Sequence, residues 1–530
     1  MNKTVKSFFT VTGFAVATRA LSFLFKMWMS RSLGAETVGL YQIALSIILL
    51  LFSLVAGAPT VLSRKVAGAK GDRNKQNAYV TSSLIIGLST GVVLVVLALS
   101  FHKQLHLLFA DDRCAKLFLI MLPTLITSTV YASLRSWFWG QKKFLTFSST
   151  ELLEEVVRIA VASILAGGIF ASIDGGTAVA IAFTVSDLAC ALVLAIIFFA
   201  KGGRLAKPQD TKEILRSTLP LSTMRILTSL SVTITALIIP ERLVNSGMSL
   251  SLATAEYGRI AGMAFPMIVA PSMAISALAV VLIPDIASLA KDNDLSAIKA
   301  KYKASLIFSA LVSGFFFILY LPFGKQLGVL FFGDEHAGEF ISYCSPMIFP
   351  MALGQATTPI LNSLGLEKRT FVNYILGAVL MLPCVFFLPK YIGVYAVALG
   401  MGLSTTITAI LNTITLYRKL GKGVGTGKAL WVLLYSIPLG VIALFTNGIL
   451  VNFLGKWFSL VITAFYATFF FVICTSAFDV VDIEGYIKMF ASTTALSLRK
   501  RCTSNKKHNR KGNTLSKQLK IRQKARKHNC

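Results

Sequence analysis

Long apolar stretches follow one another along almost the entire chain. Segments 43–62, 84–100 and 430–450 contain no charged residue, and a hydrocarbon core about 30 Å thick requires roughly 20 such residues per helix. Only 14% of the 530 residues are charged, whereas soluble domains average about 25%. We therefore expect an all-α, polytopic integral membrane protein. The fourteen expected spans are 7–30, 40–62, 79–101, 115–138, 152–171, 177–200, 216–239, 258–284, 303–323, 341–364, 371–389, 392–417, 429–451 and 457–477.

The positive charge is distributed in a way that predicts the topology. The chain has a formal net charge of +29, and segment 499–530 alone holds 13 Lys and Arg residues without an acidic residue. Most of the remaining excess lies in alternate loops, such as 63–75 and 201–216. By the positive-inside rule, both termini are expected in the cytoplasm, which requires an even number of spans. We expect the basic tail to bind anionic membrane lipids rather than nucleic acid, because no aromatic residue interrupts it to stack on bases.

Several landmarks recur in the same order in both halves of the chain. Arg19-Ala-Leu-Ser resembles Arg225-Ile-Leu-Thr, and Tyr41 and Tyr257 both open a span. This pattern predicts two six-helix lobes in the same orientation, an arrangement that transporters use to rock two bundles around a central site. The expected parts are an N-lobe at 1–207, a C-lobe at 208–425, two extra helices at 426–484, and a basic cytoplasmic tail at 485–530.

Basic side chains lie inside several of the expected spans. A charge deep in a membrane is costly and normally faces a water-filled cavity. We expect Arg19, Lys26, Arg225 and Arg259 to line such a cavity between the lobes, although Lys26 and Arg259 are near enough to span ends to anchor there instead. A cationic cavity favours an anionic substrate, and arginine suits phosphate because its planar fork donates two parallel hydrogen bonds.

Four charged residues open the fifth expected span, and two of them are spaced four residues apart. Glu154 and Arg158 have the order that favours an ion pair on one helix face. One interpretation is a gate on the cytoplasmic side between the lobes, or a proton site. The other is a helix start with a local ion pair.

Other classes of site are not supported by the sequence. The seven cysteines are scattered singly, so we expect neither disulfides nor a zinc site. Segment 421–428 lacks the GxxxxGK[ST] spacing of a nucleotide-binding loop. We therefore expect no cofactor and no catalytic residue, and the membrane potential or an ion gradient as the driving force. An enzyme such as a membrane glycosyltransferase is an alternative, but no loop is long enough for a catalytic domain.

The chain resembles the stage V sporulation protein B group of membrane proteins. The resemblance covers roughly residues 5–480 and rests on motifs in both halves. These motifs are Gly34-Ala-Glu-Thr-Val-Gly39-Leu-Tyr41, Ala58-Pro-Thr-Val-Leu-Ser-Arg64, Leu134-Arg135-Ser-Trp-Phe-Trp-Gly140, Glu154-Glu-Val-Val-Arg158, Ile239-Pro-Glu-Arg242, Tyr257-Gly258 and Leu282-Ile-Pro284. The group belongs to the multidrug/oligosaccharidyl-lipid/polysaccharide exporters, which include the MurJ-type lipid II flippases.

The resemblance implies fourteen helices, two lobes, and flipping of a polyprenyl-diphosphate-linked sugar. MurJ-type flippases carry arginines in the central cavity, and Arg19 and Arg259 match two of them. The sequence departs from that pattern elsewhere. Phe25 replaces a second arginine of the first helix, Lys26 replaces its neighbouring acid, and Phe52 and Ser53 stand where the second helix would have another arginine.

Taken together, these observations predict a flippase of the plasma membrane, acting as a monomer. The expected substrate is a lipid II-like cell-wall precursor, with a role in the spore cortex, and the expected mechanism is alternating access. Export of another lipid-linked polysaccharide unit is the main alternative. A multidrug or cation antiporter is disfavoured, because it should place acids in mid-membrane rather than arginines.

Overall fold

The structure is a computed structural model that describes residues 3–54, 57–69, 71–167, 173–421 and 427–480. Every regular element in these ranges is a helix, and the described residues contain no strand. This confirms the all-α membrane fold expected from the apolar stretches. The expected basic tail at 485–530, including the lipid contacts predicted for it, lies outside the described residues.

The first helix, α1 (Lys3–Ser53), combines two of the expected spans in 51 residues. Gly34 lies at the point where the two halves meet, and its backbone has φ 81° and ψ 169°. A residue with a side chain is strained at such a positive φ, whereas glycine is not. The chain therefore reverses direction at one residue, where the sequence suggested a loop over 31–39.

Seven further helices complete the first half of the chain. The helices are α2 (Ala58–Gly68), α3 (Arg73–Ser100), α4 (Leu105–Leu108), α5 (Asp112–Met121), α6 (Thr124–Gly140), α7 (Phe144–Ala166) and α8 (Gly175–Ala200), with a 3₁₀ turn η1 (His102–Gln104) before α4. Three of them, α3, α7 and α8, correspond to single expected spans, and the pair α5–α6 corresponds to the fourth expected span with a break at Pro123. The short helices α2 and α4 were not expected as separate elements.

The second half contains the same kinds of element and one change of helix type. The π-helix η2 (Gly258–Ala264) joins α10 (Leu250–Tyr257) to α11 (Phe265–Lys291) within a single crossing. The other elements are α9 (Thr211–Asn245), α12 (Leu295–Phe332), α13 (Glu335–Cys344), η3 (Ser345–Met347), α14 (Ile348–Ser363), α15 (Glu367–Phe387), α16 (Pro389–Ile392), α17 (Tyr395–Leu420) and α18 (Gly427–Ala477). Like α1, α18 reverses at a glycine, Gly455, with φ 78°.

The described helices can be assigned to the fourteen expected crossings. Nine helices of the described part of the chain are long and apolar enough to span a membrane, or ten if the bent pair α5–α6 counts as one span. Two of these, α1 and α18, each contain two antiparallel crossings. These ten elements thus account for twelve crossings. The remaining two crossings are α7, which carries four charged residues, and the pair α13–α14, whose members are individually short.

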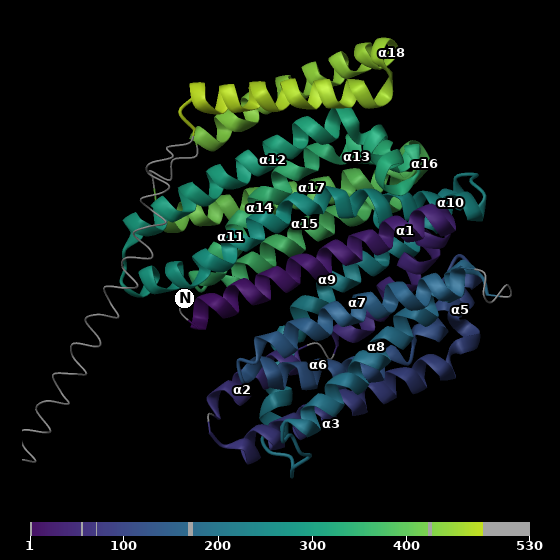
Figure 1. Ribbon diagram of the computed structural model, residues 1–530, viewed down its shortest axis with the longest axis vertical. Coiled ribbons are helices and arrows are strands. Elements are labelled where there is room, and N and C mark those ends of the chain that lie inside the picture. The colour runs from purple at the N-terminus through teal and green to yellow at the C-terminus, as the bar shows by residue number, and fades with distance from the viewer. Residues whose placement is uncertain (1–2, 55–56, 70, 168–172, 422–426, 481–530) are drawn as a thin grey trace, which may run out of the picture.

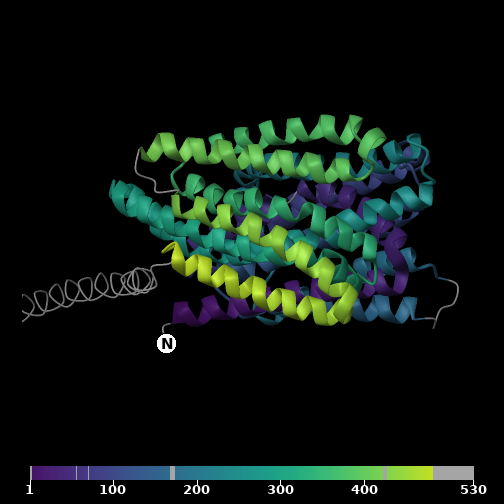
Figure 2. The ribbon, with the colours of Figure 1, turned by 90° about the horizontal axis from the view of Figure 1, so that it is seen from above.

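The helices lie roughly parallel in two groups (Figure 1). One group contains α2, α3 and α5–α8, and the other contains α9–α17 with α18 outermost. The first part of α1 runs along the boundary between them. The N-terminus and the end of α18 lie at the same end of the bundle (Figures 1 and 2), as an even number of crossings requires. We call this the N-terminal end, and the opposite one the Gly34 end.

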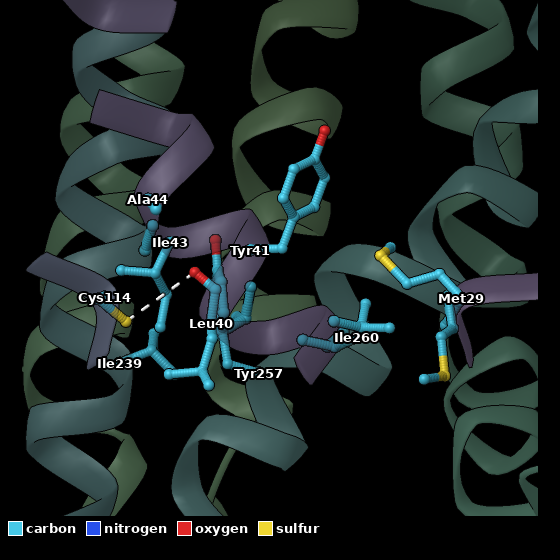
Figure 3. Packing of buried hydrophobic residues seen from close by; sticks show 14 of the residues in the cluster. Met29, Leu40, Tyr41, Ile43, Ala44, Cys114, Ile239, Tyr257 and Ile260 are labelled. Carbon is cyan, nitrogen blue, oxygen red and sulfur yellow. Dashed lines mark hydrogen bonds between the residues drawn. The ribbon is translucent and has the colours of Figure 1, made fainter. Parts of the chain in front are cut away.

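The largest hydrophobic core joins the two groups of helices. It contains Tyr41 and Ile43 of α1, Ile239 of α9, and Tyr257 and Ile260 of α10 and η2. Figure 3 shows these side chains packed together, with the Cys114 thiol directed at the Leu40 carbonyl oxygen, 3.9 Å away. The second half of α1 is therefore the central packing element of the molecule.

Candidate functional site

Two cations of the first half of α1 differ in their surroundings. Arg19 is exposed, and none of the residues that the structure describes forms a hydrogen bond or ion pair with it. At 1.5 Å per residue it lies about 22 Å along the helix from Gly34, well inside the span. Lys26 lies two turns nearer to Gly34, is partly buried, and interacts electrostatically with Glu155 of α7.

Lys26 borders a buried ionic cluster that is formed within the first group of helices. Arg158 of α7 is paired with both Glu154 and Glu155, and its Nη1 lies 2.9 Å from Glu155 Oε1. The guanidinium also lies 4.9 Å from the centre of the Phe183 ring of α8. The i, i+4 pair expected between Glu154 and Arg158 is thus present, within the first group of helices.

A third carboxylate, Asp187 of α8, belongs to the same cluster. It is buried, accepts hydrogen bonds from Thr127 and Ser128 of α6, and interacts electrostatically with Arg158. The hydrogen bond from Ser128 measures 3.0 Å. The hydroxyls thus supply polar partners to a charge that is costly to bury. With Lys26 included, two cations face three carboxylates.

The structure does not bring Arg259 together with Arg19. Arg259 is in η2, where its Nη1 lies 2.7 Å from Glu256 and its Nε lies 2.8 Å from Asp334. Its charge is therefore neutralised by two carboxylates. Arg225 is exposed on α9.

Close packing of glycines joins the two groups of helices toward the Gly34 end. A Cβ atom added to Gly258 of η2 would lie 2.7 Å from the Gly39 nitrogen, and it would also meet the Ala35 carbonyl oxygen. One added to Gly39 would meet the Thr254 carbonyl. The backbones of α1 and of α10–η2 are therefore in direct contact, a separation that only glycine permits.

Arg31 adds a polar contact to this closure. Its guanidinium donates to the carbonyl oxygens of Val329, Leu330 and Phe331, at 3.0 Å to Val329 and 3.2 Å to Phe331. The neighbouring Ser30 hydroxyl donates to the Phe332 carbonyl at 2.9 Å. These carbonyls form the C-terminal end of α12, which attracts a positive charge. Arg31 thus fastens α1 to α12 at the Gly34 end.

None of the described side chains forms a metal-binding cluster of His, Cys, Asp and Glu. The described cysteines are all unpaired. What the arrangement offers is a guanidinium inside a membrane span with no ion-pair partner among the described residues, a nearby lysine within the electrostatic influence of Glu155, and a bundle that is tightly packed toward one end.

Comparison with known proteins identifies the family. The model of the polysaccharide biosynthesis protein family matches residues 4–290. The chain belongs to this family. It is 23% identical over 426 residues to stage V sporulation protein B of Bacillus subtilis (strain 168), an alignment that covers 76% of the chain and 82% of that relative. The resemblance expected from the motifs is thereby confirmed.

Solved structures show the same fold at low sequence identity. Lipid II flippase MurJ in an inward closed conformation has a TM-score of 0.66 and 14% identity, covering 88% of this chain and 98% of MurJ. A multidrug resistance MATE family transporter of the MOP superfamily, in an inward-facing conformation, has a TM-score of 0.65 and 15% identity, covering 76% of this chain and 94% of the transporter. This member of the polysaccharide biosynthesis protein family thus has the same fold as MurJ and the MATE transporter. The two solved structures are of a lipid II flippase and of a multidrug transporter.

Two features of this family member were not expected from the sequence. Arg31 stands near the end of a span, where basic residues are common, so nothing in the sequence indicated its carbonyl partners about 300 positions away. Asp187 was overlooked because it is a single acid in an apolar helix, although a membrane-embedded acid is itself a signal of function.

Proposed function

We propose that this protein is a flippase that moves a polyprenyl-diphosphate-linked glycan between the leaflets of the plasma membrane, with both termini in the cytoplasm. The observation that carries the proposal is the exposed Arg19, which has no carboxylate partner among the described residues. A guanidinium in this position is available to an anionic group of a substrate that enters from the membrane. The family and the fold support the same function.

Lys26 is proposed as the second contact to the diphosphate. It lies seven residues from Arg19, a rise of about 10 Å, and the two long side chains can converge on neighbouring phosphate groups. Lys26 is engaged electrostatically with Glu155 in this conformation. A diphosphate that binds Lys26 competes with Glu155, so loading of the site would loosen α1 from the ionic cluster on α7.

Arg225 and Arg259 are proposed to act in another conformation of the cycle. Arg259 is held by Glu256 and Asp334 here, so it reaches a substrate only if these ion pairs open. The Glu154–Arg158 pair lies within the first group of helices. Its proposed role as a gate therefore operates through the orientation of α7 rather than through a direct contact between the lobes.

The proposed substrate is lipid II-like, because the MurJ structure that shares the fold is a lipid II flippase. A role in sporulation is proposed from the relative in Bacillus subtilis. A lipid-linked polysaccharide repeat unit has the same diphosphate and is the second candidate, favoured by the description of the family.

The test is rescue of bacteria that are depleted of their essential lipid II flippase. We expect wild-type protein to restore growth, Arg19→Ala to fail, and Arg418→Ala to rescue, because Arg418 is an exposed residue at the end of α17. Failure of the wild type despite good membrane expression would reject lipid II. Rescue by Arg19→Ala at the wild-type level would reject Arg19 as the diphosphate contact.

A further inference from the structure

A cluster of basic side chains lies at the N-terminal end of the first group of helices, away from Arg19. Lys143 directly precedes α7, Lys201 directly follows α8, and Arg73 begins α3. Three separate connections of the chain thus place a cation at this end of the bundle. Lys142, which is exposed, lies next to the partly buried Lys143.

Two of these cations approach the same aromatic ring, and the third lies close to the connection that follows α8. Lys143 Nζ lies 5.8 Å from the centre of the Phe138 ring, and Lys201 Nζ lies 5.5 Å from the centre of the same ring. Arg73 is near as well, since a Cβ added to Gly202 would lie 3.0 Å from its Nη1. Lys143 and Lys201 thus approach the same buried ring, and Arg73 lies beside the glycine that follows Lys201.

The cluster has no acidic counterion within the described part of the chain. None of Arg73, Lys142, Lys143 and Lys201 takes part in an ion pair there, and the side chain of Lys201 donates instead to Thr146 Oγ1 at 3.0 Å. Burial lowers the pKa of the Lys143 ammonium, and the nearby Lys201 and Arg73 lower it further. Like charges held together without a counterion repel one another, and an anion bound between them would relieve that repulsion.

The surroundings are those of a membrane interface. Trp139 is 40% exposed, and its ring lies 5.3 Å from Phe144 and 4.4 Å from Phe147 between centres. Leu145, in the first turn of α7, is 62% exposed. Tryptophan and other aromatic rings gather at the level of the lipid headgroups. Because Trp139 and Leu145 flank Lys142 and Lys143 in the chain, exposed apolar side chains lie next to this connection.

We propose that Arg73, Lys143 and Lys201 form a binding site for the phosphate headgroup of an anionic phospholipid. Such a lipid would place its phosphate between the three cations and its acyl chains against Trp139 and Leu145. This site is separate from the proposed diphosphate contacts on α1, and it lies in the folded helices rather than in the basic tail.

The experiment measures lipids retained by the full-length protein in native mass spectrometry. The probes are phosphatidylglycerol and phosphatidylcholine, added at equal concentration to the detergent-solubilised protein. The test variant combines Arg73→Gln, Lys143→Gln and Lys201→Gln. The control variant combines Lys368→Gln, Arg369→Gln and Lys419→Gln, which removes the same charge from exposed positions of the other half and leaves the tail intact.

We expect the wild type and the control to retain phosphatidylglycerol in preference to phosphatidylcholine, and the test variant to bind it at least about tenfold more weakly, since each basic residue contributes to headgroup attraction. Equal loss in both variants would overturn the site, because it would show a nonspecific charge effect. Equal retention of the two lipids by the wild type would overturn it as well. Displacement of phosphatidylglycerol by millimolar inorganic phosphate would show a free-anion site instead. If the triple variant does not fold, Arg73→Gln alone, at an exposed side chain, must weaken binding relative to Arg369→Gln.

Discussion

The glycine contact between α1 and η2 allows a quantitative prediction for Gly258→Ala. The new Cβ would lie 2.7 Å from the Gly39 nitrogen, whereas ordinary contacts of this kind begin near 3.4 Å. The two backbones must therefore separate by at least ~0.7 Å. Overpacking of this kind typically costs about 1–3 kcal/mol, and 1.4 kcal/mol corresponds to a tenfold change in an equilibrium constant.

This cost falls on the conformation in which the Gly34 end is closed. We therefore expect Gly258→Ala to shift the population toward an open Gly34 end by about tenfold or more. The assay is double electron–electron resonance between spin labels at Leu107 and Tyr391, two highly exposed residues near this end in different halves of the chain. Leu107 and Tyr391 are replaced by cysteine to carry the labels, after the native cysteines have been replaced by alanine. A longer label-to-label distance should gain population in the variant.

The matched control is Gly448→Ala. Gly448 is also a helical glycine, but a Cβ added there would meet no atom within 4 Å, so its distance distribution should equal that of the parent protein. If folded Gly258→Ala also gave the parent distribution, the glycine contact would not hold the two halves together, and the reasoning would be refuted.

Three further predictions concern polar contacts. Arg31→Ala should increase the labelling, by a membrane-impermeant maleimide, of a cysteine introduced at Phe332, because the variant loses the hydrogen bonds to the end of α12. Arg31→Lys should have a smaller effect, and equal labelling of both variants and the parent protein would contradict the role of Arg31. Glu155→Gln should strengthen binding of a polyprenyl diphosphate severalfold in a tryptophan-fluorescence titration, since it removes the negative charge that acts on Lys26. Unchanged or weaker binding would count against the proposed competition between Glu155 and the diphosphate for Lys26. Asn447→Ala should lower the melting temperature of the detergent-solubilised protein by a few degrees. The reason is that Asn447 links the Pro322 carbonyl of α12 to Ser459, and a buried unsatisfied group costs about 1–3 kcal/mol. The control is Asn452→Ala, at an exposed position of the same helix, and an equal melting temperature for the two variants would contradict the prediction.

The crossings themselves were predictable because hydrophobicity is a property of each segment alone. Residues 79–101 and 177–200 coincide closely with α3 and α8. The turns were harder to predict. Gly34 and Gly455 reverse the chain at single residues, and the conformation of a glycine depends on packing that its neighbours in sequence do not reveal.

Local charge pairs were likewise visible in the sequence, whereas distant ones were not. The spacing of Glu154 and Arg158 predicts their ion pair, which the structure contains. Arg259 was expected to line the cavity or to anchor at a span end, and its pair with Glu256, three residues earlier, was not predicted. Its other partner, Asp334, lies 75 residues away and meets it only through the packing of α13 on η2. The roles of Arg19, Lys26 and Arg225 in a shared cavity remain predictions.

The most direct test of the central claim is transport by the purified protein in sealed vesicles. A fluorescent polyprenyl-diphosphate disaccharide is placed in one leaflet, and its appearance in the other is followed by quenching from outside. The account predicts transport by the wild type and by Arg418→Ala, and a loss of at least tenfold with Arg19→Ala. Transport by Arg19→Ala at the wild-type rate would contradict the claim that Arg19 binds the diphosphate of a lipid-linked glycan.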